Sequence, residues 1–206
     1  MNQEVLSCDK GWGAENAVRY WGAKDAPPPR DRDARRIPGA VRIATATLRD
    51  VPLVVNEIVE GAKTGSFSCR YLEFLEIVGF ARLVFAAVLR GLFTPRSDGW
   101  HLVAARIDGR CGAACLYDVR HRQDGSSALY VVAIVVAQPW RRSGIARKML
   151  HDIVRRSISP MSVKIACAPH NLPMHRILRQ EGFFLRRPGA VLASGFTQPC
   201  EFEKSL

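Results

Sequence analysis

The sequence predicts one α/β domain, from about residue 40 to the C-terminus, preceded by an irregular extension. Three observations lead to this fold class. A nearly unbroken apolar run at residues 128–137, rich in β-branched residues, is typical of a central strand covered on both faces. An amphipathic helical pattern and a second short strand follow it. With 206 residues, 48% of them hydrophobic and 24% charged, the chain can bury one substantial core.

The pattern changes at about residue 40. Residues 1–39 mix glycine, proline and charged residues without a helical or strand period, so we expect an extension whose Trp12, Tyr20 and Trp21 suit anchoring on the domain or on a partner. A strand-like stretch covers residues 41–48. Apolar residues with helical spacing then predict a helix over 51–63.

A long apolar stretch at 71–93 has the length of a membrane span. Glu73, Glu76, Arg82 and Arg90 interrupt it, and charges are costly inside a bilayer. We therefore expect a buried or partner-facing helix that ends before Pro95. The N-terminal residues also lack the apolar run of a secretory signal, so we expect a cytoplasmic protein without a transmembrane segment.

The second half of the chain alternates strands and helices. Strands at 102–107 and 110–119 are joined by Asp108-Gly109, which suits a tight hairpin turn. A right-handed crossover through a helix from about Gly144 would place a strand at 162–168 parallel to the strand at 128–137. A helix follows at 171–180, with Pro173 in its first turn and Gly182 after its end. Strands near 183–186 and 191–203 are only weakly signalled.

Charge and cysteine content restrict the function classes. The six cysteines form no Cys-x-x-Cys pair, so we expect reduced, mostly buried thiols and no metal site. The net charge is +11, and residues 139–187 alone carry +9, from eleven Lys and Arg against two acidic residues. Such a block fits a solvated surface, a nucleic-acid footprint or a site for a phosphate-rich small ligand.

The segment 138–150, between the central strand and the following helix, is the best candidate binding site. A turn that leaves a buried strand and opens a helix presents unpaired backbone N–H groups, and the helix dipole adds positive potential there. Gly144 allows close approach of a pyrophosphate, and basic side chains add charge for further phosphates. An ordinary strand-to-helix turn with a basic helix is the alternative. The predicted loop contacts are Arg141, Arg142, Ser143, Gly144, Ile145, Ala146 and Arg147, with Lys148 adding charge.

At this point the chain resembles the GNAT acetyltransferase superfamily. The family's acetyl-CoA loop, Arg/Gln-x-x-Gly-x-Gly/Ala, is similar to Arg141-Arg142-Ser143-Gly144-Ile145-Ala146. Its second signature, Asn-x-x-Ala-x-x-x-Tyr-x-x-x-Gly-Phe, is matched in spacing by Asn171, Met174, Leu178, Gly182 and Phe183. Two patterns in the right order are more specific than either alone. The resemblance covers about residues 102–183 and extends back to about 41.

The resemblance implies a mixed, mostly antiparallel sheet flanked by helices, in which the strands at 128–137 and 162–168 splay apart. Acetyl-CoA would enter this gap as co-substrate. Strand amides at Ile134, Val135, Val136 and Ala137 would hold the pantetheine arm and polarise the thioester carbonyl, and Asn171 would contact the pantetheine. The anionic coenzyme then accounts for the basic block, and nucleic acid is no longer needed to explain it.

The catalytic groups are harder to assign. Leu178 replaces the tyrosine that protonates the departing thiolate in many members, so that role is vacant. His170 is a weak candidate for the general base, His175 is more simply a solvent-facing side chain, and Cys167 is more simply a buried structural thiol. Glu73 and Glu76 would line an acceptor pocket if the long helix flanked the cleft.

We therefore expect an N-acetyltransferase that transfers an acetyl group from acetyl-CoA to an amine of a small molecule or peptide. A catalytically weak CoA-binding regulatory module is the alternative, and a nucleic-acid-binding protein is disfavoured by the two signatures. The sequence leaves open the acceptor, the acyl chain length and whether the chain forms a homodimer.

Overall fold

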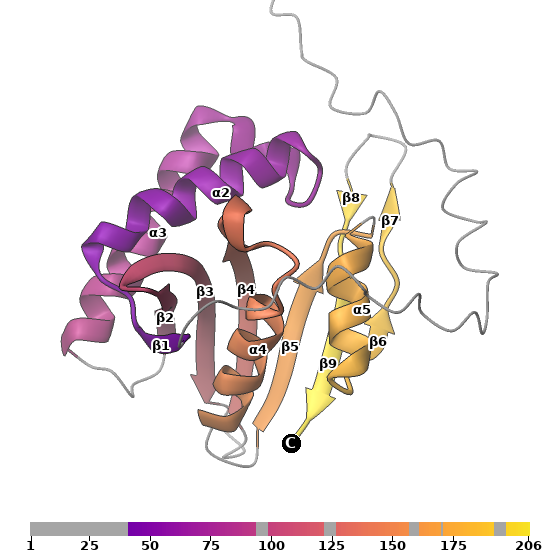
Figure 1. The fold of residues 1–206 in the computed structure, drawn as a ribbon. Coiled ribbons are helices and arrows are strands. Elements are labelled where there is room, and N and C mark those ends of the chain that lie inside the picture. Colours follow the sequence, from indigo (N-terminus) through magenta and orange to yellow (C-terminus); the bar gives the residue numbers. More distant parts are fainter. Residues whose placement is uncertain (1–40, 94–98, 122–126, 157–160, 170, 192–196) are drawn as a thin grey trace, which may run out of the picture.

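A seven-stranded sheet forms the centre of the computed structural model, in the order β1-β2-β3-β4-β5-β9-β6 (Figure 1). The structure describes residues 41–93, 99–121, 127–156, 161–169, 171–191 and 197–206. The predicted extension and His170 therefore lie outside the described residues. The strands of this sheet are β1 (Arg42–Thr45), β2 (Gly99–Ile107), β3 (Arg110–His121), β4 (Ser127–Val136), β5 (Met161–Cys167), β6 (Phe184–Arg187) and β9 (Cys200–Ser205).

The β2–β3 hairpin forms at the predicted turn. Asp108 and Gly109 have φ angles of 50° and 78°, the left-handed values that a two-residue turn between antiparallel strands needs. The pairing runs from Ile107 and Arg110 outward to Gly99 and Val119. β1 is shorter than the expected strand and pairs with β2 at the edge of the sheet.

β4 and β5 are parallel neighbours that part halfway along. Their register runs from Ser127 opposite Met161 to Val131 opposite Ile165 and ends there, although β4 continues to Val136. Val132 is an extra residue in the β3–β4 ladder, because Leu116 pairs with Ala133 and Tyr117 with Val131. A bulge increases local twist and bends the strand that carries it. The predicted splay of the two central strands is thus confirmed, and the bulge gives its physical cause.

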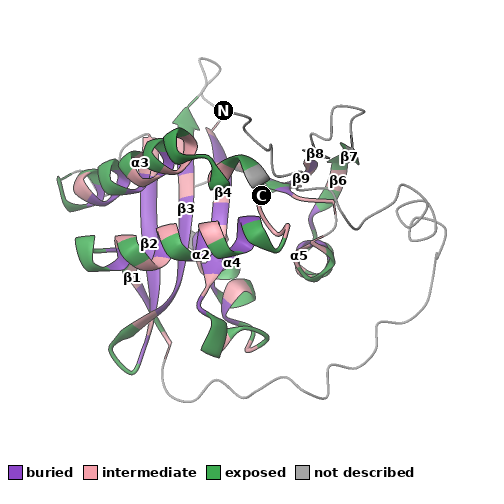
Figure 2. Ribbon diagram, turned by 90° about the horizontal axis from the view of Figure 1, so that it is seen from above, coloured by how far each residue is buried: buried purple, intermediate pink, exposed green. Residues whose placement is uncertain are grey.

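Helices cover both faces of the sheet. They are α2 (Val51–Lys63), α3 (Phe74–Phe93), α4 (Ile145–Arg156) and α5 (Leu172–Gln180). Residues of α2 and α3 share one apolar cluster with Ala133 and Val135 of β4, whereas residues of α4 and α5 share another with Leu129 and Val131. Figure 2 shows the strands β2, β3 and β4 largely buried and the outer faces of the helices exposed. β4 is covered on both faces, as predicted.

Local sequence explains where the helices begin and end. Asp50 precedes α2, and its Oδ2 accepts a 2.7 Å hydrogen bond from the backbone N–H of Thr47. The amphipathic helix predicted from about Gly144 is α4. The helix predicted from residue 71 is instead a 3-10 turn, η2 (Cys69–Leu72), followed by α3, because the extended backbone of Glu73 separates the two. Within the described residues, no helix is long and apolar enough to cross a membrane.

The C-terminal strands differ most from the expectation. The single weak strand expected at 191–203 is divided into β7 (Ala190–Val191), β8 (Thr197–Gln198) and β9, of which the first two pair with each other. β9 lies between β5 and β6 and is antiparallel to both. Both of its edges are therefore paired, and it brings the last residues of the chain beside β5.

Candidate functional site

The turn between β4 and α4 has the backbone shape that anion binding needs. It passes through a 3-10 turn, η3 (Gln138–Trp140), and then through left-handed φ angles of 62° at Arg142 and 81° at Gly144. The first α-helical hydrogen bond runs from Lys148 N–H to Gly144 C=O, at 3.0 Å. Amides before Lys148 thus have no intrahelical acceptor and point out of the helix N-terminus. A Cβ at Gly144 would meet nothing within 4 Å, so the space above the turn is open.

Two of the predicted basic residues tie the turn to its neighbours. Arg141 reaches Glu57 on α2 at 2.8 Å and donates through Nε to Val136 C=O at 3.2 Å. Arg147 lies 2.5 Å from Glu181, just after α5. Ser143 turns inward, where its hydroxyl donates to the carbonyl of Trp140. These three side chains hold the turn in shape.

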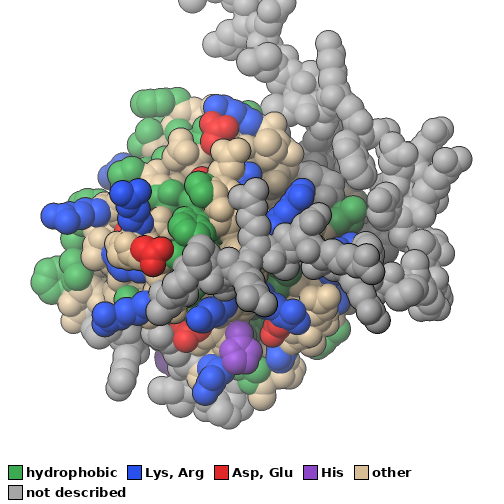
Figure 3. Space-filling model, in the orientation of Figure 1, with side chains coloured by type: hydrophobic (Ala, Val, Ile, Leu, Met, Phe, Trp, Pro, Cys, Tyr) green, Lys and Arg blue, Asp and Glu red, His purple; other side chains and the backbone are tan. Residues whose placement is uncertain are grey.

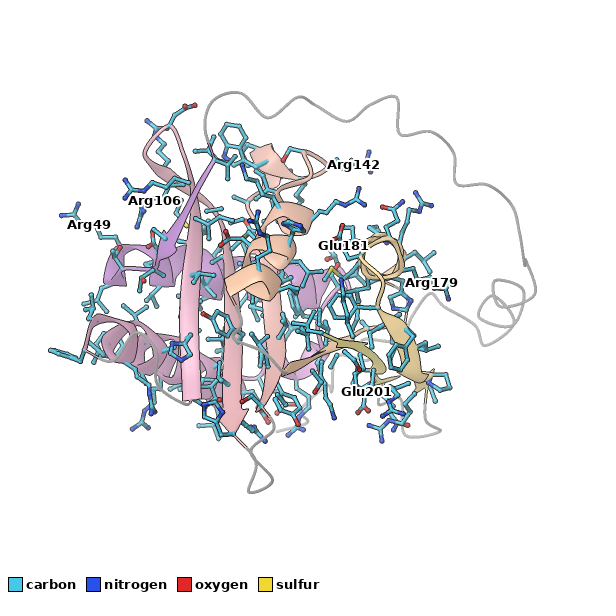
Figure 4. All side chains as sticks on the ribbon, turned by 90° about the horizontal axis from the view of Figure 1, so that it is seen from below. Arg49, Arg106, Arg142, Arg179, Glu181 and Glu201 are labelled. Atoms are coloured by element: carbon cyan, nitrogen blue, oxygen red, sulfur yellow. The ribbon has the colours of Figure 1, made fainter. Side chains whose placement is uncertain are left out.

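Arg142 and Lys148 are exposed, and they are the loop side chains best placed to meet further anionic groups. Figure 4 shows Arg142 extending from the turn on the α4 side of the sheet. Figure 3 shows Lys and Arg predominating over Asp and Glu on the face that carries α4 and α5. The predicted charge around the turn is therefore present, although Arg141 and Arg147 already have carboxylate partners.

The four predicted strand residues divide into two pairs. Ala137 N–H donates to Gly112 C=O of β3 at 2.9 Å. Because successive backbone groups of a strand point to opposite edges, Val135 N–H also faces β3, whereas the amides of Ile134 and Val136 face β5. β5 has already diverged at this level. The N–H groups of Ile134 and Val136 therefore face the splay and can bind a ligand that enters it.

Asn171 lies at the start of α5, beside the end of β5. Its Oδ1 accepts a hydrogen bond of 3.3 Å from the N–H of Met174 and so caps the helix. The Asn171 side chain is half-buried, and among the described residues its amide NH₂ has no acceptor, so it can donate to a ligand. This arrangement fits the predicted contact, which stays a prediction.

The other candidate catalytic residues have structural roles. His175 is buried, its Nε2 is 3.0 Å from Ala168 C=O, and its ring packs edge-on against Phe202, so the expectation of a solvent-facing histidine is wrong. Leu178 is fully buried in the apolar cluster under α4 and α5. Burial raises the pKa of Cys167 to about 12, so this thiol stays protonated at neutral pH.

A cavity of about 540 Å³ opens on the opposite face of the sheet, beside the point where β4 and β5 part. Val131, Val132, Ile165 and Ala166 form its inner edge at the splay. Tyr71, half-buried on η2, and Trp100 on β2 supply aromatic walls. Its charged and polar lining residues are Asp118, Arg120, Tyr130, Lys164, Arg186, Glu201 and Glu203. Figure 4 shows Glu201 on the α3 side of the strands, away from Arg142 and Glu181.

One rung of the sheet supplies much of this lining. Trp100 pairs with Asp118, Asp118 with Tyr130, Tyr130 with Lys164, and Lys164 with Glu203, across five neighbouring strands. The side chains of such a rung lie side by side on one face of a sheet. A continuous row of polar groups therefore crosses the part of this face that α2 and α3 leave open.

The sequence prediction missed this cavity. It placed acidic groups of an acceptor pocket at Glu73 and Glu76, but both side chains lie outside the cavity lining, and Glu76 pairs with Arg70 at 2.5 Å. Two of the three cavity carboxylates, Glu201 and Glu203, come from a strand that was only weakly signalled, whereas Asp118 lies on the predicted strand at 110–119. The available signal was the alternation of Glu201, Phe202 and Glu203, which predicts one polar and one apolar strand face.

Comparison with known proteins identifies the fold. The model of the acetyltransferase (GNAT) family matches residues 85–183. None of the curated proteins matches the sequence.

Three solved structures illustrate the likeness. The PaiA N-acetyltransferase of Thermoplasma acidophilum, in complex with coenzyme A, has a TM-score of 0.58 at 11% identity, over 81% of this chain and 99% of that one. The putative acetyltransferase yncA of Salmonella typhimurium, with acetyl-CoA, has a TM-score of 0.59 at 13% identity, over 82% and 95%. The ribosomal-protein-alanine N-acetyltransferase of Brucella melitensis has a TM-score of 0.57 at 16% identity, over 80% and 99%. At these identities the likeness establishes the fold alone.

Proposed function

Because the chain belongs to the acetyltransferase (GNAT) family, we propose that it transfers an acetyl group from acetyl-CoA to the nitrogen of an amine. Acetyl-CoA supplies the acetyl group as a thioester, and transfer forms the C–N bond of an amide while the C–S bond breaks and coenzyme A leaves as its thiol. The amine loses one proton in this exchange. The acceptor is a small molecule or a peptide.

One observation carries the proposal: β4 and β5 part next to the turn before α4, and a cavity on the α3 face reaches the same point. The amides of Ile134 and Val136 face the gap between β4 and β5, and the turn that follows β4 offers further backbone donors. On the α3 face, the cavity reaches the same point at Val132 and Ala166. A two-substrate transfer needs this geometry, because the thioester and the amine must meet from different directions.

The residues of the chain have separable roles in this proposal. The amides of the turn and the N-terminus of α4 bind pyrophosphate, and Arg142 and Lys148 add positive charge. Ile134 and Val136 donate to the pantetheine arm and the thioester oxygen. Asn171 orients the arm from the other side of the splay. Fixed donors of this kind need no reorganisation during the reaction, which is why they lower its barrier.

A thiol-release assay tests the proposal. The protein is incubated with acetyl-CoA and a panel of amines, amino acids and peptides, and free thiol is followed with a thiol reagent while mass spectrometry detects an added acetyl group. We expect acceptor-dependent release of coenzyme A together with an acetylated amine. Release without an acetylated product, or no release with any acceptor despite tight binding of acetyl-CoA, would reject the transfer.

A CoA-binding module with little turnover is the second candidate. Leu178 favours it, because an aliphatic side chain stands where many members of the family have the tyrosine that protonates the thiolate. A thiol with a pKa of about 8.5 is nevertheless a fair leaving group without a dedicated acid. Equal affinity for acetyl-CoA and coenzyme A without any turnover would support the module over the enzyme.

A further inference from the structure

The cavity on the α3 face is lined by hydrogen-bond donors that have no acceptor among the described residues, whereas each of its three carboxylates has an arginine partner. Arg120 gives its Nε to Asp118 at 2.6 Å, and Arg186 gives its Nε to Glu203 at 2.6 Å. Asp118 and Glu203 are buried, at 4% and 8% exposure, and each has an arginine as partner. The two buried carboxylates are thus neutralised within the protein, and neither offers an unopposed negative charge to a cationic ligand.

Of the three basic side chains that line the cavity, Lys164 is the one that makes no hydrogen bond to the described residues. Its side chain is 33% exposed, and Glu203 Oε1 lies 3.9 Å from its ammonium, too far for a hydrogen bond. Within the described residues, the Lys164 ammonium has no hydrogen-bond acceptor. A half-buried ammonium group gains most from an anionic ligand that supplies the missing acceptor atoms.

Tyr130 and Arg120 converge on the same place. The Tyr130 ring lies between two cations, with Arg120 Cζ 4.9 Å and Lys164 Nζ 5.7 Å from its centroid. In the described part of the chain the Tyr130 hydroxyl has no hydrogen-bond partner, and Arg120 bonds only through Nε, so its Nη groups remain as donors. Arg120, Tyr130 and Lys164 thus form a group of donors on one side of the cavity.

This donor group lies next to the reaction point. Tyr130 and Lys164 are opposite each other in the last but one rung of the β4–β5 ladder. Val132 and Ala166, at the splay, are each two residues further along, or about 7 Å at the usual rise per residue. An anion held by Arg120, Tyr130 and Lys164 would therefore place an amine a few bonds away at the point where β4 and β5 part.

From these observations we infer that the acceptor is an amine that carries an anionic group, a carboxylate or a phosphate, within about 7 Å of its nitrogen. Arg120, Tyr130 and Lys164 bind that anion and so determine specificity. This inference rests on the proposed acetyl transfer and adds the substrate class. The aromatic walls at Tyr71 and Trp100 accommodate an apolar side chain of the same molecule.

Matched pairs of acceptors test the substrate class. The pairs are tryptophan and tryptamine, phenylalanine and phenethylamine, and phosphoethanolamine and ethanolamine, each measured by release of coenzyme A. We expect kcat/KM at least 10-fold higher for the anionic member of a pair. The amino-acid pairs report on a carboxylate and the last pair on a phosphate, so the favoured pair identifies the anion.

Two variants test the residues. Lys164→Gln should reduce the preference for the anionic member to about 2-fold or less, mainly by raising its KM, and Tyr130→Phe should reduce it partly while keeping the ring. Lys63→Gln removes the same charge from the exposed end of α2, outside the cavity lining, and should leave the preference unchanged. Melting temperatures of the variants check that each one is folded.

The outcomes separate this inference from the proposed function. Acetylation of the amines without an anionic group at an equal or higher rate would overturn the substrate class while leaving acetyl transfer intact. Acetylation of those amines alone, and of none of the anionic ones, would do the same. A preference that survives Lys164→Gln in folded protein would overturn the role of Lys164. Failure to bind acetyl-CoA at all would instead overturn the proposed function.

Discussion

Gly144 is the residue on which the proposed phosphate-binding turn depends most. Its φ of 81° lies in the left-handed region that costs other residues about 1–2 kcal/mol, and the space where a side chain would project is open. An open space beside helix amides is where an anion would lie. A substitution at Gly144 therefore has two separate effects: it strains the backbone, and it fills the space where an anion would lie.

We expect Gly144→Glu to abolish the rise in melting temperature that acetyl-CoA causes, because a carboxylate would occupy the phosphate position and repel the ligand. Gly144→Ala is the matched control, since it carries the same backbone strain with only one methyl group. It should lower the melting temperature as Gly144→Glu does, yet keep measurable affinity for acetyl-CoA by calorimetry. Retained binding in the glutamate variant would mean that the turn does not bind phosphate.

Leu178 is a residue of the hydrophobic core. Its side chain is fully buried, so Leu178→Ala should lower the free energy of unfolding by about 2–5 kcal/mol, measured by urea denaturation. Turnover at saturating acetyl-CoA should change much less, because an aliphatic side chain donates no proton. A large loss of kcat in folded protein with unchanged affinity for acetyl-CoA would show that Leu178 shapes the reacting geometry.

The thiols of Cys167, which is buried, and Cys111, which is half-buried, should react slowly in the native state. Burial raises the pKa of Cys167 and, together with the neighbouring Asp50, of Cys111 to about 12, whereas an unfolded thiol has a pKa near 8.5. Both should react slowly with iodoacetamide at pH 8 and fast after unfolding in urea. The unfolded state alone loses these protons above about pH 8.5, so their contribution to stability is present below that pH and falls as pH rises toward 12. Fast alkylation of folded protein would contradict this.

At the scale of elements, the bulge at Val132 links the fold to the site. The bulge turns β4 away from β5, and the separation leaves the amides of Ile134 and Val136 without a strand partner among the described residues. The cavity on the α3 face reaches the same point along the two strands, at Val132 and Ala166. In the proposed transfer, one irregularity of pairing would therefore give access to both substrates.

Asn171 shows how one side chain can serve a helix and a ligand. Asn171→Ala should cost about 0.5–2 kcal/mol of stability through loss of the α5 cap. Asn171→Asp keeps the capping oxygen but loses the NH₂ donor, so its stability should stay near that of the wild type. If Asn171 also contacts the pantetheine, both variants should bind acetyl-CoA more weakly in calorimetry. Unchanged affinity of the aspartate variant would leave Asn171 with the capping role alone.

The elements that the sequence predicted are those whose signals are local. The Asp108-Gly109 turn, the apolar run of β4 and the helical spacing of α2 and α4 each follow from residues near one another in sequence. The insertion of β9 between β5 and β6 depends on pairing between distant segments, which short strands signal weakly.

The candidate site also has one part that local sequence predicts and another that depends on contacts between distant segments. The turn proposed to bind the coenzyme was predictable because one continuous segment, from β4 to α4, forms it. The partners of Arg141 and Arg147, which are Glu57 and Glu181, could not be read from that segment. The cavity lining of Asp118, Lys164 and Glu203 also comes from separate strands, and only the register of the sheet brings these residues together.

At the scale of the whole molecule, the distribution of charge matches the two faces of the sheet. Arg141, Arg142, Arg147 and Lys148 of the basic block between residues 139 and 187 lie at the turn before α4 and would suit a strongly anionic coenzyme, whereas Lys164 and Arg186 of the same block line the cavity on the α3 face. The cavity on the α3 face is lined by three basic and three acidic side chains, and two pairs among them, Arg120 with Asp118 and Arg186 with Glu203, are hydrogen-bonded. The two faces therefore differ in electrostatic character.

Binding of acetyl-CoA to the intact protein tests this account most directly, by melting temperature with acetyl-CoA, coenzyme A, NAD and ATP at equal millimolar concentrations. Ligands that bind only the folded state stabilise it by mass action. We predict a clear rise with acetyl-CoA and coenzyme A and a much smaller one with NAD or ATP. No shift with acetyl-CoA in well-folded protein, or an equal shift with all four ligands, would contradict the account.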